Sequence, residues 1–402
     1  MRKSFKWGIR IALCLWCLLL FSGCGQLREY LGQKSDDNTV ASHGETDDSV
    51  VVRDQYEGAP DIGAQAQVQS ISNGNYAYEH LSEEGKQVYD QMLAAILDYQ
   101  EKVNLATMDT ELMKDAYQAL NCDYGGLFWT DGYVFTTYML GEEPISLEFS
   151  PTYIMEKSEK DAIQGQVDAV VDEWLGGISI QDSDYEKAKY VFETLIERVD
   201  YVEGSKDNQN ILSVFLHGET VCQGYACATQ YLLRQLGIPS LIITGTANNQ
   251  AHAWNIVELD GKYYHMDTTW GNSTYLNTEQ QEAKYVNYNF LCMTDEEIGR
   301  THQVQMGFVL PECNSMEHDY YVVEGRYFDS WDPGRIGSVL REAWESGNPS
   351  VDIKLKDAEL YEQMKDYFIQ QQKIVDYCDG IEYVYYMEAP DVCVFTVNFE
   401  EK

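Results

Sequence analysis

The chain has 402 residues, enough for two or three domains, and its composition is that of a globular protein. Acidic residues outnumber basic ones by 66 to 28, which gives a formal net charge of -38 at pH 7. Such a charge repels phosphate backbones, so we expect no nucleic-acid partner.

The first 23 residues have the layout of an export signal. An apolar run over residues 11–21 follows four basic residues, Arg2, Lys3, Lys6 and Arg10. This run is shorter than the roughly 20 apolar residues that a membrane-spanning helix needs. We therefore predict a signal peptide over residues 1–23.

The signal ends in Ser22-Gly23-Cys24, which resembles the lipobox of bacterial lipoproteins, although Phe21 stands where that motif usually has Leu. The resemblance implies cleavage before Cys24, a lipid on its sulfur, and an extracytoplasmic protein anchored to the bacterial cell membrane. The alternative is a plain secretory signal in which Cys24 occurs by chance. Residues 24–77 are polar and acidic and predict a flexible tether with a span of roughly 40 Å.

Two amphipathic helices are predicted next, with a short hairpin between them. The first carries apolar residues at helical spacing from Leu81 to Leu97, and the second from Ala188 to Val199. Ser183 and Glu186 form a capping box at the start of the second. The aromatic segment 124–140, YGGLFWTDGYVFTTYML, predicts the hairpin. We expect residues 78–180, which precede the second helix, to form a mainly helical N-terminal region.

The stretch VCQGYACATQYLLRQLGIP places a cysteine at the start of a helix. Apolar residues at helical spacing follow Cys222, and Gly237 with Pro239 ends the helix. The N–H groups and dipole of a helix N-terminus favour a negative sulfur and lower a thiol pKa. Cys222 is thus a candidate nucleophile, whereas Cys227, within the helix, is interpreted as a small core residue.

A thiolate nucleophile needs an imidazole to handle its proton, and the next segments provide one. SLIITGT and AHAWNIVEL read as strands, and Asp260-Gly261 is a two-residue hairpin turn into KYYHMDTTW. With this turn Leu259 faces Lys262, which makes Asp267 a diagonal neighbour of His252 on one sheet face. The register predicts a hydrogen bond between His252 and Asp267.

Three motifs in this order resemble the transglutaminase-like branch of the papain-like cysteine enzymes. They are VCQGYA at 221–226, HAWN at 252–255 and DGKYYHMDTTW at 260–270, and the likeness extends through FLCMTDEEIGRTH at 290–302. The resemblance implies an α+β papain-like transglutaminase core over residues 181–304, with the cysteine helix packed on an antiparallel sheet. It implies Cys222 as nucleophile, His252 as base and acid, and Asp267 as the group that orients the imidazole.

Two departures from the family pattern lie near these motifs. Tyr263 stands where many relatives have Trp, and Gly271-Asn272 replaces an acidic pair. Neither touches the three candidate catalytic residues, but both could reshape a substrate cleft.

The C-terminal residues 305–402 alternate predicted strands and helices and indicate a small α/β unit without a catalytic signature. Its expected helices span 333–344 and 360–375, and YYVVEGRYF, VDIKLK, EYVYYM and VCVFTVNF are the other predicted elements.

Together these features predict a cell-surface lipoprotein that attacks amide bonds through a thioester, as a peptidase rather than a protein cross-linker. Its partners would be a peptide or protein substrate, which could be cell-wall associated, and the membrane through the lipid. No cofactor is expected. The competing hypothesis is an inactive surface module that binds a wall polymer or partner protein.

Two further hypotheses concern individual residues. A zinc site built from Cys222, Cys227 and His252 is disfavoured, because the spacing does not suit a tetrahedral site and no fourth ligand is evident. His265 is interpreted as a structural residue rather than a second base. Seven cysteines remain after Cys24, an odd number that leaves a thiol free or paired between molecules.

Overall fold

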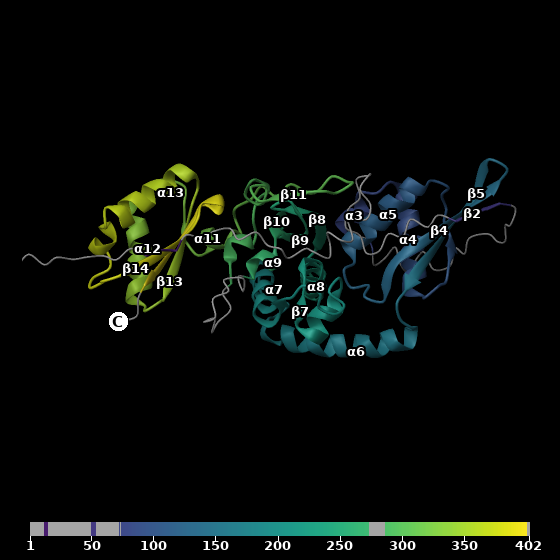
Figure 1. Cartoon of the computed structure of the whole chain (residues 1–402), viewed down its shortest axis with the longest axis horizontal. Coiled ribbons are helices and arrows are strands. Elements are labelled where there is room, and N and C mark those ends of the chain that lie inside the picture. The colour runs from purple at the N-terminus through teal and green to yellow at the C-terminus, as the bar shows by residue number, and fades with distance from the viewer. Residues whose placement is uncertain (1–11, 15–49, 54–71, 73, 273–285, 400–402) are drawn as a thin grey trace, which may run out of the picture. The chain divides into compact units, whose positions relative to one another are not determined.

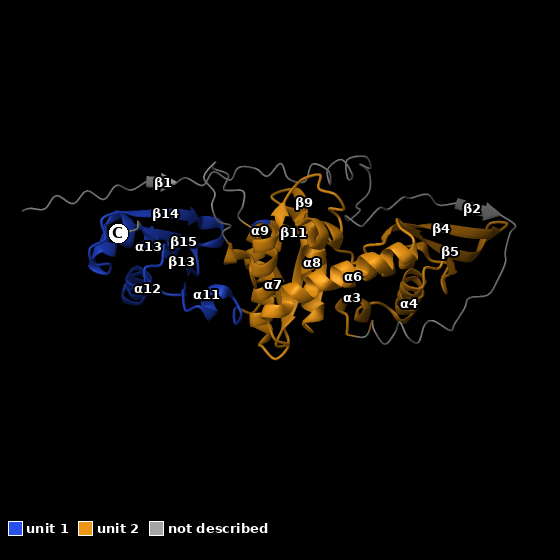
Figure 2. Ribbon diagram, turned by 90° about the horizontal axis from the view of Figure 1, so that it is seen from below, with its two compact units in different colours: residues 1–21, 299–301, 316–402 blue, residues 22–298, 302–315 orange. Residues whose placement is uncertain are grey.

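The computed structural model describes residues 12–14, 50–53, 72, 74–272 and 286–399. Most of the predicted signal peptide and tether, including Cys24, lies outside the described residues. The chain divides into a larger unit of residues 22–298 and 302–315 and a smaller unit of residues 1–21, 299–301 and 316–402 (Figure 2). Among the described residues, no helix combines the length and apolar character needed to cross a membrane.

The N-terminal part of the larger unit packs helices beside a small sheet (Figure 1). The helices are α3 (Tyr76–Glu79), α4 (Glu83–Leu97) and α5 (Thr110–Asp123). The sheet has the order β2-β4-β5-β3, with β2 at Val50–Arg53, β3 at Val103–Asn104, β4 at Thr130–Leu140 and β5 at Glu143–Tyr153. The predicted helix from Leu81 is confirmed as α4.

The hairpin predicted within residues 124–140 is wrong in extent. Gly132 has φ 78° but lies at an irregularity inside β4, where the pairing shifts between Thr130 and Tyr133. The chain turns at Gly141, φ 66°, and the partner strand is β5. A glycine with positive φ occurs in β-bulges as well as in turns, so Gly132 by itself did not indicate where the chain turns.

Helix α6 (Lys157–Trp174) connects the N-terminal part of this unit to the part with the cysteine helix (Figure 1). The ammonium of Lys160 lies 4.9 Å from the ring centroid of Trp129, and Gln164 Nε2 donates to the Tyr231 hydroxyl at 3.0 Å. The short helix η1 (Leu175–Gly177) follows, and then α7 (Asp184–Arg198), which begins with the predicted Ser183–Glu186 capping box.

The remaining core of the larger unit is helix α8 (Cys222–Gln235) and a four-stranded sheet of order β10-β9-β8-β11. The strands are β8 (Ser240–Ala247), β9 (Gln250–Leu259), β10 (Lys262–Met266) and β11 (His302–Val304), and every neighbouring pair is antiparallel. Gly237, φ 76°, ends α8 as predicted, with Ile238 N–H bonded to the Leu233 carbonyl at 2.9 Å. The arrangement is an α+β, papain-like core.

Short elements connect the longer ones. They are β6 (Asp200–Tyr201), η2 (Ser213–His217), β7 (Glu219–Thr220), α9 (Thr268–Gly271), η3 (Tyr288–Phe290) and α10 (Asp295–Ile298).

The smaller unit is built on a mixed sheet of order β1-β14-β15-β13-β12. The strands are β1 (Ala12–Cys14), β12 (Tyr327–Phe328), β13 (Ser350–Leu355), β14 (Val384–Ala389) and β15 (Val394–Phe399). Its helices are α11 (Tyr320–Val323), α12 (Pro333–Glu345), α13 (Ala358–Met364), η4 (Lys365–Gln370), η5 (Lys373–Asp376) and η6 (Pro390–Val392).

Two predictions for the smaller unit need correction. The segment YYVVEGRYF is not one strand, because Asp319 caps the helix α11 and only Tyr327–Phe328 is extended. The helix expected over 360–375 is broken: α13 passes into the wide turn η4, and Gln372 with φ 58° separates η4 from η5. The predicted helix at Pro333 is confirmed as α12.

Candidate active site

Cys222 is the first residue of helix α8. Val221 before it is extended, and the Cys222 side chain is buried, with 1% of its surface exposed. The N–H groups in the first turn of a helix have no partners within the helix, and the helix dipole is positive at this end. Both features act in favour of a negative sulfur, whereas burial of the side chain acts against it.

Gly224 allows strand β7 to lie against the first turn of α8. A Cβ atom at Gly224 would fall 1.9 Å from Oγ1 of Thr220 and 2.9 Å from Oγ of Ser213. These two hydroxyl oxygens are themselves 2.6 Å apart and buried. A larger residue at this position would have to displace the side chain of Thr220, two residues before Cys222.

The hairpin of β9 and β10 has the predicted register. Leu259 pairs with Lys262, and the pairing continues to Asn255 with Met266. Asp260 and Gly261 have φ 50° and 74°, so both turn residues are left-handed, as a tight hairpin of this kind requires. Asp267 follows directly after the last residue of β10.

His252, on β9, bonds to Asp267 as the hairpin register predicts. Its Nε2 lies 2.8 Å from Oδ2 of Asp267, and the two side chains are 5% and 0% exposed. Because a carboxylate only accepts, His252 donates from Nε2. Its Nδ1 is then the nitrogen left to exchange a proton with a nucleophile.

The other oxygen of Asp267 holds the carboxylate in place. Oδ1 accepts from the backbone N–H of Thr269 at 2.9 Å and of Trp270 at 3.1 Å, which makes Asp267 the N-cap of α9. Burial acts to raise the Asp267 pKa, but the positive charge of His252 and hydrogen bonds from His252 and His302 outweigh it. The net pKa lies well below its usual range, so the carboxylate stays ionised.

Helix α8 is attached to the elements that carry His252 and Asp267. Asn255 Nδ2, on β9, donates to the carbonyl of Ala226, one helical turn after Cys222, at 3.0 Å. The hydroxyls of Thr229 and Thr268 lie 2.9 Å apart. These contacts fix the helix that starts at Cys222 against the strand of His252 and the turn after Asp267.

Residues 173–268 match the model of the transglutaminase-like superfamily, and Cys222, His252 and Asp267 all lie within the match. The chain contains a transglutaminase-like domain. The match includes helix α7 and ends at the first residue of α9.

Solved structures similar to this chain are only distantly related. The alignment with a TGase covers 44% of this chain and 61% of the TGase chain, at 13% sequence identity and a TM-score of 0.27. The alignment with a candidate cysteine protease from Cytophaga hutchinsonii covers 33% of this chain and 55% of the protease chain, at 17% sequence identity and a TM-score of 0.23. The alignment with the periplasmic domain of TgpA from Pseudomonas aeruginosa covers 32% of this chain and 55% of the TgpA chain, at 16% sequence identity and a TM-score of 0.21.

Each of these likenesses covers less than two thirds of the other protein's chain. Likeness this weak bears on neither the substrate nor the activity of the transglutaminase-like domain. No curated protein matches the chain in sequence.

A second imidazole, from outside the family match, contacts the Asp267 carboxylate, and the motifs did not predict it. Nε2 of His302 lies 3.1 Å from Asp267 Oδ2, the same oxygen that His252 contacts, and the two imidazole centroids are 5.2 Å apart. Burial lowers the pKa of His302 and outweighs the opposing effect of Asp267. His302 therefore remains a neutral donor to Asp267. The available signal was its place at the end of the family-like segment 290–302.

Gly245 allows the strand of His302 to join the sheet. A Cβ atom at Gly245 would fall 2.1 Å from the backbone oxygen of Gln303 and 3.0 Å from Cη2 of Trp254. Strand β11 pairs with β8 from His302 opposite Ala247 to Val304 opposite Gly245. The absence of a side chain at Gly245 thus leaves room for both β11 and the Trp254 ring.

His265 supports the tryptophan that lies beside His252. Trp254 Nε1 donates to His265 Nδ1 at 3.0 Å, so the His265 proton is on Nε2, which is 2.9 Å from Asp295 Oδ1. The rings of His252 and Trp254 are nearly parallel, 18° apart in plane with centroids 6.0 Å apart. These contacts agree with the interpretation of His265 as a structural residue.

The departures from the family pattern have structural roles. A Cβ atom at Gly271 would fall 2.3 Å from the Phe192 ring on α7. Asn272 Nδ2 donates to the Val199 carbonyl at 3.0 Å and contacts the Tyr225 hydroxyl at 2.7 Å. Gly271 and Asn272 therefore help to join α7, α8 and α9.

Two groups of described side chains carry metal-binding atoms within 4.8 Å of one another: His252, Asp267 and His302, and His265, Asp295 and Cys313. The zinc set of Cys222, Cys227 and His252 is not among the groups that the described residues form. Cys227 is fully buried, Gln223 Nε2 lies 3.4 Å from its sulfur, and burial raises its pKa to about 12. All seven cysteines from Cys122 to Cys393 are free thiols.

Replacing His302 with Gln should change how stability depends on pH. The folded chain resists protonation of His302, whereas the unfolded chain accepts a proton below about pH 6.5, so this histidine's contribution to stability falls as pH falls through that range. Gln retains a donor for Asp267 but does not titrate. In urea unfolding, the stability advantage of the wild type over His302→Gln should shrink between about pH 7.5 and about pH 5.

The matched control is His80→Gln, which removes an exposed histidine. Its stability difference from the wild type should not shrink in the same way. A His302→Gln difference that is constant with pH would show that His302 titrates alike in the folded and unfolded chains.

Proposed function

We propose that the transglutaminase-like domain is a cysteine hydrolase acting on amide bonds of peptides, with Cys222, His252 and Asp267 as its catalytic residues. The observation that carries the proposal is the buried 2.8 Å hydrogen bond between His252 Nε2 and Asp267 Oδ2. It occurs within the family match and on elements attached to the helix that begins at Cys222.

Each residue has a defined part in the proposed reaction. The Cys222 thiolate attacks the amide carbonyl carbon, and His252 gives the proton on Nδ1 to the departing amine as the C–N bond breaks. A thioester remains on Cys222. Water then attacks it while His252 takes a proton from that water, and the carbon–sulfur bond breaks to release a carboxylic acid. Asp267 orients the imidazole and stabilises its charged form.

The burial of the reacting groups bears on the alternative function. Cys222 is 1% exposed and His252 is 5% exposed, so substrate must gain access to a largely covered thiol. An inactive binding module would share this covered site but would have no need of an activated sulfur. Reactivity of Cys222 toward an electrophile therefore distinguishes the two functions.

Covalent labelling tests the nucleophile. A peptide chloromethyl ketone should label the wild type at one cysteine, and Cys222→Ala should abolish the labelling, because only this sulfur lies at a helix N-terminus in the family match. Labelled peptides should be identified by mass spectrometry after digestion. The matched control is Cys227→Ala, which should leave labelling intact because Cys227 is buried with a raised pKa.

Labelling that persists on another cysteine in Cys222→Ala would make the assignment wrong. An unlabelled wild type with no activity across a peptide library would favour the binding module.

Replacing Asp267 with Asn should lower the turnover of a peptide substrate by about 10²–10⁴-fold, because the amide favours the wrong His252 tautomer and removes the charge that stabilises imidazolium. The pH at which Cys222 becomes reactive should also rise toward that of an ordinary thiol. Both are measured from the rate of labelling and of peptide cleavage against pH.

Asp295→Asn is the matched control, since Asp295 also accepts a hydrogen bond from a buried histidine, His265. It should retain most activity and the wild-type pH profile. Full activity in Asp267→Asn would reduce the proposed triad to Cys222 and His252 at most.

We also propose that the chain is an extracytoplasmic lipoprotein, held to the bacterial membrane through Cys24. The support is the sequence of the signal and lipobox alone. In a bacterial host the wild type should fractionate with membranes, and Cys24→Ser should be released or remain unprocessed. Unchanged fractionation and normal cleavage of Cys24→Ser would leave a plain secreted enzyme.

A further inference from the structure

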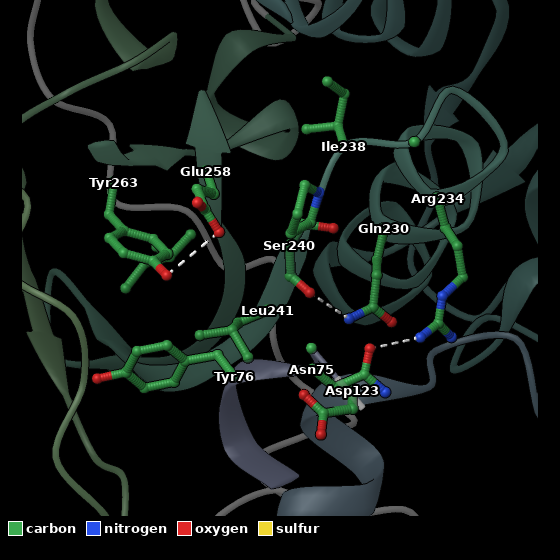
Figure 3. A pocket seen from close by; sticks show the side chains of 14 residues that line it. Asn75, Tyr76, Asp123, Gln230, Arg234, Ile238, Ser240, Leu241, Glu258 and Tyr263 are labelled. Atoms are coloured by element: carbon green, nitrogen blue, oxygen red, sulfur yellow. Dashed lines mark hydrogen bonds between the residues drawn. The ribbon is translucent and has the colours of Figure 1, made fainter. Parts of the chain in front are cut away.

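A concave site lies near the end of helix α8 opposite Cys222. A cavity of about 320 Å³ is lined by residues of α8, β8, β9 and β10, by Asp123 at the end of α5, by the segment between α8 and β8, and by the chain just before and within α3 (Figure 3). Arg234 in its wall is twelve positions after Cys222 on the same helix, roughly 18 Å along the axis at 1.5 Å per residue. The volume suits a small ligand.

Arg234 supplies a positive charge to this cavity. Its Nη2 donates to Asn75 Oδ1 at 2.8 Å, and its guanidinium lies 4.3 Å from the centroid of the Tyr124 ring. Among the described residues Arg234 has no carboxylate within ion-pair distance, in a chain with 66 acidic residues. Its hydrogen-bond partner Asn75 and its ring partner Tyr124 are neutral, so the guanidinium keeps donors that match the two oxygens of a carboxylate.

Asp123 is the wall carboxylate on which the charge of Arg234 acts. Asp123 is buried and accepts from the Tyr78 N–H at 3.0 Å and the Tyr89 hydroxyl at 3.1 Å. Burial raises its pKa to about 7, against the opposing effects of these hydrogen bonds and of the Arg234 charge, and so disfavours its ionised form. The Arg234 side of the cavity therefore favours an anion.

The other side of the cavity favours a cation. Figure 3 shows Glu258 and Tyr263 across from Arg234, with Leu241 between the two sides. Glu258 Oε2 accepts from the Tyr263 hydroxyl at 3.2 Å, and Glu258 has no cationic partner in the part of the chain that the structure describes. Tyr263 meets Tyr76 edge to face, with centroids 5.7 Å apart. A carboxylate with two tyrosine rings attracts an ammonium group.

We propose that this cavity binds a small zwitterion, a free dipeptide, with its carboxylate at Arg234 and its ammonium at Glu258 and the two tyrosines. Leu241, Ile238 and Ile256 supply apolar surface for the side chains. A zwitterion pairs with both wall charges, whereas a simple anion or a simple cation leaves one of them unpaired. The site uses no residue of the proposed catalytic triad, so it stands or falls apart from the reaction at Cys222.

The test measures binding of alanyl-leucine to the full chain by isothermal titration calorimetry, with alanyl-leucine amide and N-acetyl-alanyl-leucine as the two singly charged analogues. The dipeptide should bind the wild type and Cys222→Ala alike, and each analogue should bind at least about tenfold more weakly because one charge-assisted contact is missing. Arg234→Gln should weaken the dipeptide by about tenfold and remove its advantage over the amide. Glu258→Gln should remove its advantage over the acetylated analogue.

Arg335→Gln is the matched control. Arg335 also lies over an aromatic ring, 5.1 Å from the Phe328 centroid, but on α12 outside the cavity, and this variant should bind as the wild type does. The ligand analogues test the proposal on unmodified protein, whether or not a variant folds. The proposal would be overturned if the dipeptide showed no saturable binding, or if it did not bind to Cys222→Ala. It would also be overturned if all three ligands bound equally, or if only one of the two analogues bound more weakly than the dipeptide.

Discussion

One buried carboxylate connects the parts of the candidate active site. Asp267 uses one oxygen to cap α9 and the other to accept from two imidazoles, and its side chain is fully buried. An ionised group without water is stable only if its hydrogen-bonding capacity is filled. The cap, the hairpin that carries His252 and the strand that carries His302 must therefore all be in place together.

The sequence predicted the half of this network that local turn chemistry determines. Asp260-Gly261 favours a two-residue hairpin turn, and this turn sets the residue pairing between β9 and β10. The contact of His252 with Asp267 could therefore be predicted from their positions relative to the turn. His302 could not be found in this way. It joins through β11, which pairs with β8 across more than 50 positions of chain, and no turn links the two strands. That pairing depends on close approach at Gly245, which only coordinates reveal.

The difference between local and non-local determinants also explains why the bounds of the predicted hairpin and of the predicted C-terminal helix were wrong. Gly132 and Gly141 both have positive φ, but one bulges a strand and the other turns the chain. The difference depends on which residues pair across the sheet, a non-local property. In the smaller unit, the apolar spacing after Leu360 fits a helix, yet packing divides it into α13, η4 and η5. Periodicity indicates which face is buried but does not fix where a helix must break.

The fixed tautomer of His252 has a consequence for the order of events in the proposed reaction. Nε2 is held by Asp267, so Nδ1 alone must accept the thiol proton, deliver it to the leaving amine and later deprotonate water. One nitrogen cannot serve the amine and the water at once. The amine product must therefore leave Nδ1 of His252 before a water molecule can bind there. The proposed reaction thus follows a ping-pong kinetic scheme, with an acyl-enzyme between two half-reactions.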